Sequence, residues 1–249
     1  MRRSNQCYRK TPVIGAYVLI LAGLGFGLSC GCGNAERPVE PIEVSPVAKT
    51  DTCLITPLGA VIGSGEGQLD DIQFVARSRC NQLTRLHATR VPELTNMHFA
   101  SGLVMIQSLE LAYNENLQSL EGLQSVTEMA QLTLNYNESL KDLSALRNIR
   151  LLGGRTYGSI KGSLYISANP TLESLDGLQN VESVQSIKIA ANESLRSISA
   201  LHGVEGLESV TILNNANLPR CRIDTFLESL PTRPENVTIE NNGAGECER

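Results

Sequence analysis

Tryptophan is absent from this sequence of 249 residues, and all aromatic residues together make up only 4% of it. A folded interior must therefore be built from aliphatic side chains, which are abundant because 41% of the residues are hydrophobic. Such a composition is typical of a core assembled from many similar small layers. The chain is long enough to bury one or two cores, which excludes disorder throughout.

Histidine and clustered positive charge are also scarce. Only three histidines occur, and the formal net charge is −5, with basic residues spread along the chain. A nucleic-acid partner demands clustered Lys and Arg that displace counterions from phosphates, so no such partner is predicted. The sequence contains no G-x-S-x-G or H-E-x-x-H motif and no phosphate-binding glycine loop. These absences predict a protein without catalytic residues, cofactor or metal.

Near the N-terminus, the apolar run from Val13 to Ser29 lacks charge, and a basic flank between Arg2 and Lys10 precedes it. This order is that of an export signal, with its n-region and h-region. The run is slightly short for a membrane crossing, ends in small residues and is followed by no basic stop-transfer cluster. We therefore predict a cleaved signal peptide over residues 1–29.

The sequence FGLSCGCG at the end of this run resembles the lipobox of bacterial lipoproteins, in which small residues precede a cysteine that receives diacylglycerol. Cys32 and Cys30 both fit that pattern. Processing at Cys32 leaves an even number of later cysteines, whereas processing at Cys30 leaves Cys32 as an odd thiol. The resemblance implies an exported protein, anchored by lipid to the outer membrane or cell surface. An ordinary secretory signal with incidental cysteines is the alternative.

Residues 30–52 contain several prolines and no apolar periodicity, so we expect a lipid anchor followed by an extended, flexible tether.

A 23-residue unit repeats along the rest of the chain, which indicates a solenoid. SLELAYNENLQSLEGLQSV from Ser108 aligns with QLTLNYNESLKDLSALRNI from Gln131, and two further copies begin at Ser163 and Ser186. Each copy opens with an apolar, any, apolar triplet, which predicts a short strand with one buried face. Stacked copies would place these strands in parallel, hydrogen-bonded from one repeat to the next.

Less perfect copies start at Val210, at Val237 and at Ile72, where Arg77 and Cys80 replace the usual Asn and Leu. The full array thus has about six to seven coils.

An asparagine follows each triplet by three residues, and leucines then recur at every third position. Amides at equivalent turns of a stack can satisfy the buried backbone groups there, so we predict a structural ladder. The ladder consists of Asn114, Asn137, Asn169, Asn192, Asn215 and Asn242. The leucine spacing predicts a tight helical turn or a flat convex segment on the opposite side of each coil.

This pattern resembles the receptor L domain, a leucine-rich-repeat-like right-handed β-helix found in receptor ectodomains and in many bacterial surface lipoproteins. The resemblance covers about residues 53–247 and rests on leucine at plus three from asparagine, as in Asn114 to Leu117, on the motif S-L-x-G-L-x-x-V, and on the closing L-P-x-C that ends at Cys221. It implies a mainly β solenoid over residues 53–249. Because the chain has one array, with no second L domain, cysteine-rich module or kinase, receptor signalling is not implied.

Solenoid ends need caps. The four cysteines near the ends permit three connectivities, of which Cys53–Cys80 and Cys221–Cys247 are the most local. We therefore predict disulfide-closed caps, with a short helix from Asp224 to Leu230 inside the last one.

Exposed residues that alternate with the buried strand positions form the first candidate binding face, since tyrosine is rare here and is common at protein and sugar contacts. The candidates are Tyr113, Asn135, Tyr136, Tyr165 and Lys188. A second candidate is the insertion over residues 150–162, which is basic and could bind an acidic partner. Glu115, Glu138 and Glu193 follow ladder asparagines, but no Asp-rich loop accompanies them, so no calcium site is predicted.

We therefore expect a non-catalytic cell-envelope lipoprotein that presents a solenoid surface to an unknown protein or glycan. A structural or adhesive envelope scaffold without a discrete ligand is the alternative. A remote alternative is a glycoside-cleaving enzyme, because paired carboxylates on a β-helix face need no motif.

Overall fold

Successive strands of one sheet all run in parallel. The computed structural model describes residues 60–62, 75–76, 80–153, 161–245 and 247, all within one unit, Lys49–Arg249. The sheet order is β1-β2-β3-β4-β6-β7-β8-β9, and β5 also pairs with β4. The strands are β1 (Ala60–Ile62), β2 (Gln82–Thr89), β3 (Met105–Ala112), β4 (Glu128–Asn135), β5 (Leu151–Leu152), β6 (Ser163–Ser167), β7 (Ser186–Ala190), β8 (Ser209–Leu213) and β9 (Asn236–Glu240).

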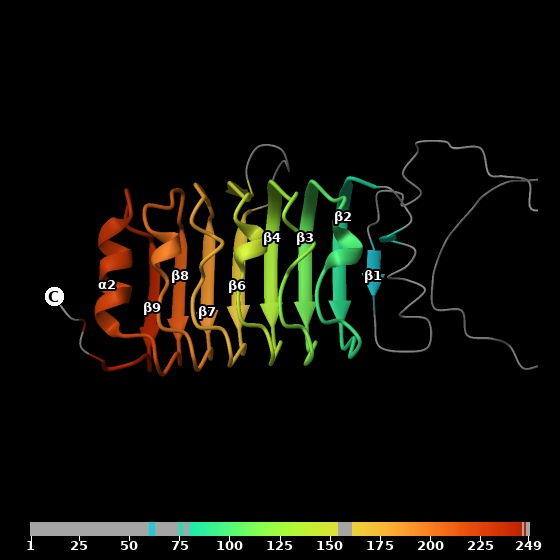
Figure 1. Ribbon diagram of the computed structural model, residues 1–249. Coiled ribbons are helices and arrows are strands. Elements are labelled where there is room, and N and C mark those ends of the chain that lie inside the picture. The colour runs from blue at the N-terminus through green and yellow to red at the C-terminus, as the bar shows by residue number, and fades with distance from the viewer. Residues whose placement is uncertain (1–59, 63–74, 77–79, 154–160, 246, 248–249) are drawn as a thin grey trace, which may run out of the picture. The chain divides into compact units, whose positions relative to one another are not determined.

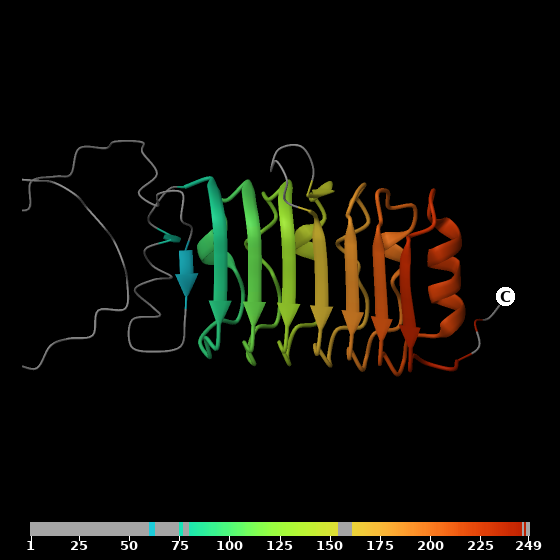
Figure 2. The same cartoon turned by 180° about the vertical axis from the view of Figure 1, so that it is seen from behind.

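Equivalent residues of successive repeats are neighbours in the sheet. Leu109 pairs with Leu86 on one side and with Leu132 on the other, and the row continues through Leu164, Ile187, Val210 and Val237. Figures 1 and 2 show β2 to β9 side by side, with helix α2 (Arg220–Ser229) at the C-terminal end. The prediction of a mainly β chain, with one parallel sheet built between repeats, is confirmed.

The core is aliphatic and continuous from coil to coil. Leu109 and Leu111 of β3 are fully buried, and so are Leu117, Leu120 and Leu123, which follow at the three-residue spacing. Each such side chain contributes about 2 kcal/mol by leaving water. Because one coil covers the next, no coil could retain this burial alone.

The turn asparagines form one hydrogen-bonded file, and Asn114, Asn137, Asn169, Asn192 and Asn215 are fully buried. The Oδ1 of Asn169 accepts the backbone N–H of Asn137 at 3.1 Å, and its Nδ2 donates to the Leu134 carbonyl at 2.9 Å. The same pattern recurs along the file. The file provides partners for backbone N–H and C=O groups that would otherwise be buried without a hydrogen bond.

The coil that contains β2 has a different register from the predicted one. Starting the repeat at Ile72 placed Arg77 in the asparagine position, but the structure places Val91 there, and its N–H donates to Asn114 Oδ1 at 3.0 Å. Leu94 takes the following leucine position and is buried, while Val75 is helical. The prediction was wrong because the side chain of Val91 has no amide group that would mark this turn in the sequence.

Two kinds of turn alternate on the side opposite the sheet. The 3-10 turns η1 (His98–Ala100), η2 (Ser144–Leu146) and η4 (Ser199–Leu201) belong to alternate coils. The coils between them carry Gly122 and Gly177, whose φ angles are +116° and +117°. A Cβ on Gly122 would lie 2.0 Å from the Met97 carbonyl oxygen, just before η1, so glycine permits this close approach.

The insertion between β4 and β6 leaves the sheet without disturbing its register. β5 pairs with the first residues of β4, and β6 pairs with the later ones. Gly153 and Gly162 lie against each other where the loop departs and returns, and a Cβ on Gly162 would lie 1.6 Å from the Leu152 carbonyl oxygen. The Gly162 N–H donates to Gln185 Oε1.

Helix α2 caps the C-terminal end and begins earlier than predicted. The expected start was Asp224, whereas the structure begins the helix at Arg220, directly after Pro219. A proline at this point loses no hydrogen bond and has a φ suited to the first turn. Ile223 and Phe226 of α2 are fully buried against the core.

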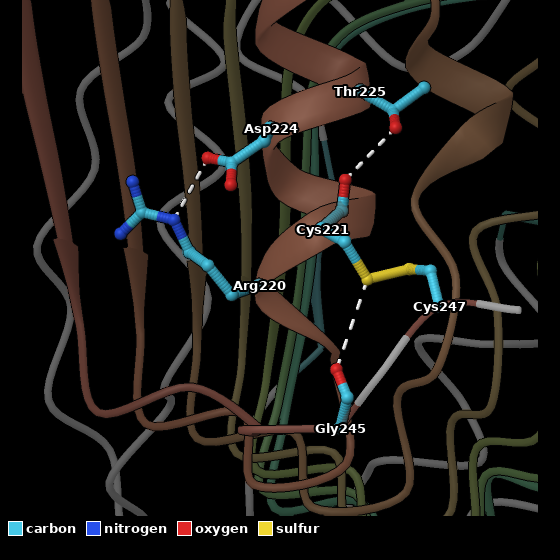
Figure 3. The surroundings of a disulfide bond; sticks show 6 residues. All are labelled: Arg220, Cys221, Asp224, Thr225, Gly245 and Cys247. Carbon is cyan, nitrogen blue, oxygen red and sulfur yellow. Dashed lines mark hydrogen bonds and ion pairs between the residues drawn. A yellow bond between two sulfur atoms is a disulfide. The ribbon is translucent and has the colours of Figure 1, made fainter. Parts of the chain in front are cut away.

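A disulfide holds this helix to the C-terminal segment. Cys221 and Cys247, the predicted pair, are bonded, with their Cα atoms 6.0 Å apart (Figure 3). Thr225 Oγ1 donates to the Cys221 carbonyl at 2.9 Å in the same turn. Cys80 is also disulfide-bonded, while Cys53, its predicted partner, lies outside the described residues.

Loss of the Cys221–Cys247 bond should destabilise the C-terminal cap. The bond closes a loop with a sequence separation of 26, which corresponds to about 3 kcal/mol in the chain-entropy model. We expect the Cys221→Ser/Cys247→Ser double variant to lose about that free energy of unfolding in urea titrations. An unchanged midpoint would show that α2 is held by packing alone.

Candidate binding face

Two rows of solvent-facing residues run from coil to coil beside the buried rows. The strand row lies at the centre of the strands and consists of His87, Glu110, Thr133, Tyr165, Lys188, Thr211 and Thr238. The turn row lies just after the strands, at the residue before each ladder position, and all its φ angles are left-handed. It consists of Arg90, Tyr113, Tyr136, Ala168, Ala191, Asn214 and Asn241.

The tyrosines divide between these rows instead of sharing one alternating face. Tyr165 lies in the strand row, between Thr133 and Lys188. Tyr113 and Tyr136 lie in the turn row, with φ angles of 58° and 55°. The left-handed backbone ends the period of two at these positions, so periodicity could not separate the rows.

Tyr113 and Tyr136 form a stack that Arg90 extends. The two rings are 4.6 Å apart between centroids and only 4° from parallel. The Arg90 guanidinium carbon lies over the Tyr113 ring, 4.7 Å from its centre, and forms a cation–π contact with it. Tyr113 and Tyr136 nevertheless remain 46% and 50% exposed. The sequence did not reveal Arg90 as part of the face, because its coil was placed in the wrong register.

An acidic depression lies beside this stack. Its cavity volume is about 470 Å³, and its walls are Arg90, Pro92, Tyr113, Glu115, Tyr136 and Glu138. Among the described residues, neither glutamate forms an ion pair. The depression thus offers aromatic surface and two free carboxylates together.

A second depression covers the neighbouring coils and is rich in hydroxyl groups. Its volume is about 390 Å³, and it is lined by Asn135, Tyr165, Ser167, Ser186, Ile187, Lys188, Ser209 and Thr211. Ser167 Oγ donates to Asn135 Oδ1 at 2.7 Å, which orients that amide. The predicted residues Asn135, Tyr165 and Lys188 therefore line one depression, and Tyr113 and Tyr136 line the other.

His87 extends the strand row beyond the predicted residues. Its Nε2 lies 3.4 Å from Ser108 Oγ, and its Nδ1 lies 3.4 Å from a Glu110 carboxylate oxygen. Burial lowers the pKa of His87 below its ordinary value; the Glu110 charge opposes this shift and Arg85 adds to it. The ring is therefore neutral at pH 7, and its contact with Glu110 is not an ion pair there.

This lowered pKa predicts that stability falls on acidification. Below about pH 6.5 the unfolded chain binds a proton at His87 more readily than the folded chain does, so protonation favours unfolding. We expect the unfolding free energy from urea titration to drop less between neutral pH and the acid side of this window in His87→Gln than in the parent. Equal pH dependence in both proteins would contradict the assigned direction.

The basic insertion has fewer free charges than predicted. Arg150 Nη1 lies 3.3 Å from Glu182, and Lys161 Nζ lies 2.5 Å from Glu208. The hydrogen bond that Lys161 donates to Glu208, together with the negative charge of Glu208, raises the pKa of Lys161. Arg155 and Tyr157 lie outside the described residues, so the binding role of this loop stays a prediction.

No group of three or more His, Cys, Asp or Glu side chains in the described part of the chain is placed to hold a metal ion. Glu115, Glu138 and Glu193 lie in this described part and belong to no such group. The described segments also contain no helix whose length and apolarity would let it span a membrane.

Part of the chain matches a known protein family. Residues 96–201 match the receptor L domain family. Receptor L domains are ligand-binding and non-catalytic in general. No curated protein matches the chain. The receptor L domain match is shorter than the expected 53–247, yet β2, β8 and β9 continue the same register outside it. It includes Tyr113, Tyr136, Tyr165 and Lys188.

Proposed function

We propose that this chain is a non-catalytic, ligand-binding protein of the cell envelope, and that the strand row and the turn row form its binding face for a protein or glycan. The observation that carries the proposal is the Arg90–Tyr113–Tyr136 stack, which keeps aromatic surface in solvent beside two open depressions. The receptor L domain match supports it, since that domain type binds ligands.

Rigidity favours this use of the face. Tyrosine has only two side-chain torsions, and here neighbouring groups and a fixed backbone restrict them further. A face that is already ordered loses little conformational entropy when a ligand binds.

The tyrosines provide the direct test. Capture from native envelope extracts with the parent chain should retain a partner, and the variant Tyr113→Ala/Tyr136→Ala/Tyr165→Ala should lose most of it, on the order of tenfold. Circular dichroism and urea titration would check that the variant still folds. Equal retention by both proteins would favour the scaffold without a discrete ligand.

We further propose the lipid anchor, with Cys32 or Cys30 as the modified residue after removal of residues 1–29. Support comes from the lipobox-like sequence and the parity of the later cysteines. Mass spectrometry of the N-terminal peptide from membranes should show a diacylglyceryl group on one cysteine. Cys32→Ala and Cys30→Ala are matched variants, and an unmodified N-terminus in the parent would overturn the anchor.

A further inference from the structure

The stack in the turn row has one open end. Arg90, Tyr113 and Tyr136 place a planar group in each of three successive coils, and the next position is Ala168. A methyl group cannot cover a phenol ring. Among the described residues, Tyr136 has no aromatic or cationic partner beyond Tyr113, and it is the most exposed of the large hydrophobic side chains.

The position beside Ala168 is spaced for one more planar group. Tyr113 and Tyr136 already stack at 4.6 Å, which is close to the general spacing of neighbouring strands. A ligand group that stacked on the free face of Tyr136 would therefore lie above Ala168, in step with the coils. Arg90 at the opposite end shows that this file accepts a guanidinium.

The surrounding charge selects among planar groups. Glu138 follows Tyr136 by two residues, and both line the acidic depression together with Glu115. Arg90 is the one basic residue of that lining and lies at its far end, three coils from Ala168. A cation is thus favoured at the open end, and a guanidinium stacks on aromatic faces better than an ammonium does.

A sugar ring would find fewer partners at this end. Hydroxyl-bearing side chains gather in the other depression, and Ser167, the one nearest to Ala168 in sequence, already donates its hydroxyl to Asn135. The neighbours in the turn row, Ala168 and Ala191, offer only methyl groups. The open end therefore suits a peptide better than a glycan.

We propose that the ligand of this face is a protein segment bearing an arginine, whose guanidinium stacks on the free face of Tyr136 and lies near the Glu138 carboxylate. This inference rests on the proposed function and narrows its ligand to a basic peptide.

Fluorescein-labelled octa-arginine and octa-lysine test it, since they carry equal charge and differ in stacking. By fluorescence anisotropy at about 150 mM salt, the parent chain should bind octa-arginine about threefold more tightly than octa-lysine. Tyr136→Ala should reduce this ratio to about one. Asp176→Ala, at an exposed position outside both rows, should leave it unchanged.

Two arginine substitutions form a matched pair. Ala168→Arg should fill the open end with the chain's own guanidinium, as Arg90 does at the other end, and the two positions share φ angles of 53° and 54°. The ratio should again fall to about one. Asn180→Arg adds the same charge at an exposed position outside both rows and should keep the preference.

A ratio of one in the parent, or a preference that survives Tyr136→Ala, would overturn the inference. So would preferential binding of an envelope oligosaccharide at Tyr136. If envelope capture then still depended on Tyr165 and Lys188, the proposed function would stand and only the arginine contact would fall.

Discussion

Asn169→Ala should cost about 4 kcal/mol of unfolding free energy, one of the two largest effects expected in this protein. The substitution removes the acceptor of the Asn137 N–H and the donor to the Leu134 carbonyl, both in the core of the turn. Asn192 also loses one of the donors to its Oδ1. Each buried polar group left without a partner costs about 1–3 kcal/mol. Urea titration followed by circular dichroism would measure the loss.

Asn116→Ala is the matched control, because it makes the same chemical change on an exposed side chain. Asn116 Nδ2 donates one bond, to the Pro92 carbonyl at 3.0 Å, and its loss should cost less than about 1 kcal/mol. If Asn169→Ala and Asn116→Ala caused equally small losses of unfolding free energy, water would be able to replace the hydrogen bonds of the buried ladder.

Gly177→Ala should be nearly as damaging, at about 3 kcal/mol or more. The added Cβ would lie 2.0 Å from the Leu143 carbonyl oxygen, and the φ of +117° is unfavourable to alanine. Leu143 lies directly before η2 of the preceding coil, so the clash would push two coils apart. Differential scanning calorimetry would report the loss as a lowered Tm.

Gly203→Ala separates the two causes. Gly203 has a φ of +76° but nothing within 4 Å of an added Cβ, so it should lose only the backbone term, about 1 kcal/mol. The difference between Gly177→Ala and Gly203→Ala then measures the close approach of coils. Equal losses would mean that the coils can separate at no cost.

The repeat made much of the fold predictable. A strand of period two and an asparagine at a fixed distance recur in each good copy, so the parallel sheet and the file through Asn114, Asn137 and Asn169 follow from spacing. The alternation of 3-10 turns and glycine turns was not predicted from the sequence. Gly177 and Ala145 occupy the same position after their asparagines, and the glycine marks the coil without a 3-10 turn.

The candidate face was harder to predict, because it depends on a backbone feature that leaves no periodic signal. Seven non-glycine residues of four types hold left-handed φ angles in the turn row, and Tyr113 and Tyr136 are two of them. The stacking of the two rings requires these left-handed φ angles as well as the spacing of the coils. Arg90 was missed because Val91 replaces the asparagine that marks other coils.

Site-specific photo-cross-linking in the native envelope tests the central claim, that the sheet side is where a partner binds. A photoreactive phenylalanine analogue would replace Tyr136 or Tyr165 on the face, or Glu121 or Asp176 in the exposed turns of the opposite side. The account predicts cross-links to one partner from positions 136 and 165 and none from 121 and 176. Cross-links from the opposite side alone would contradict it.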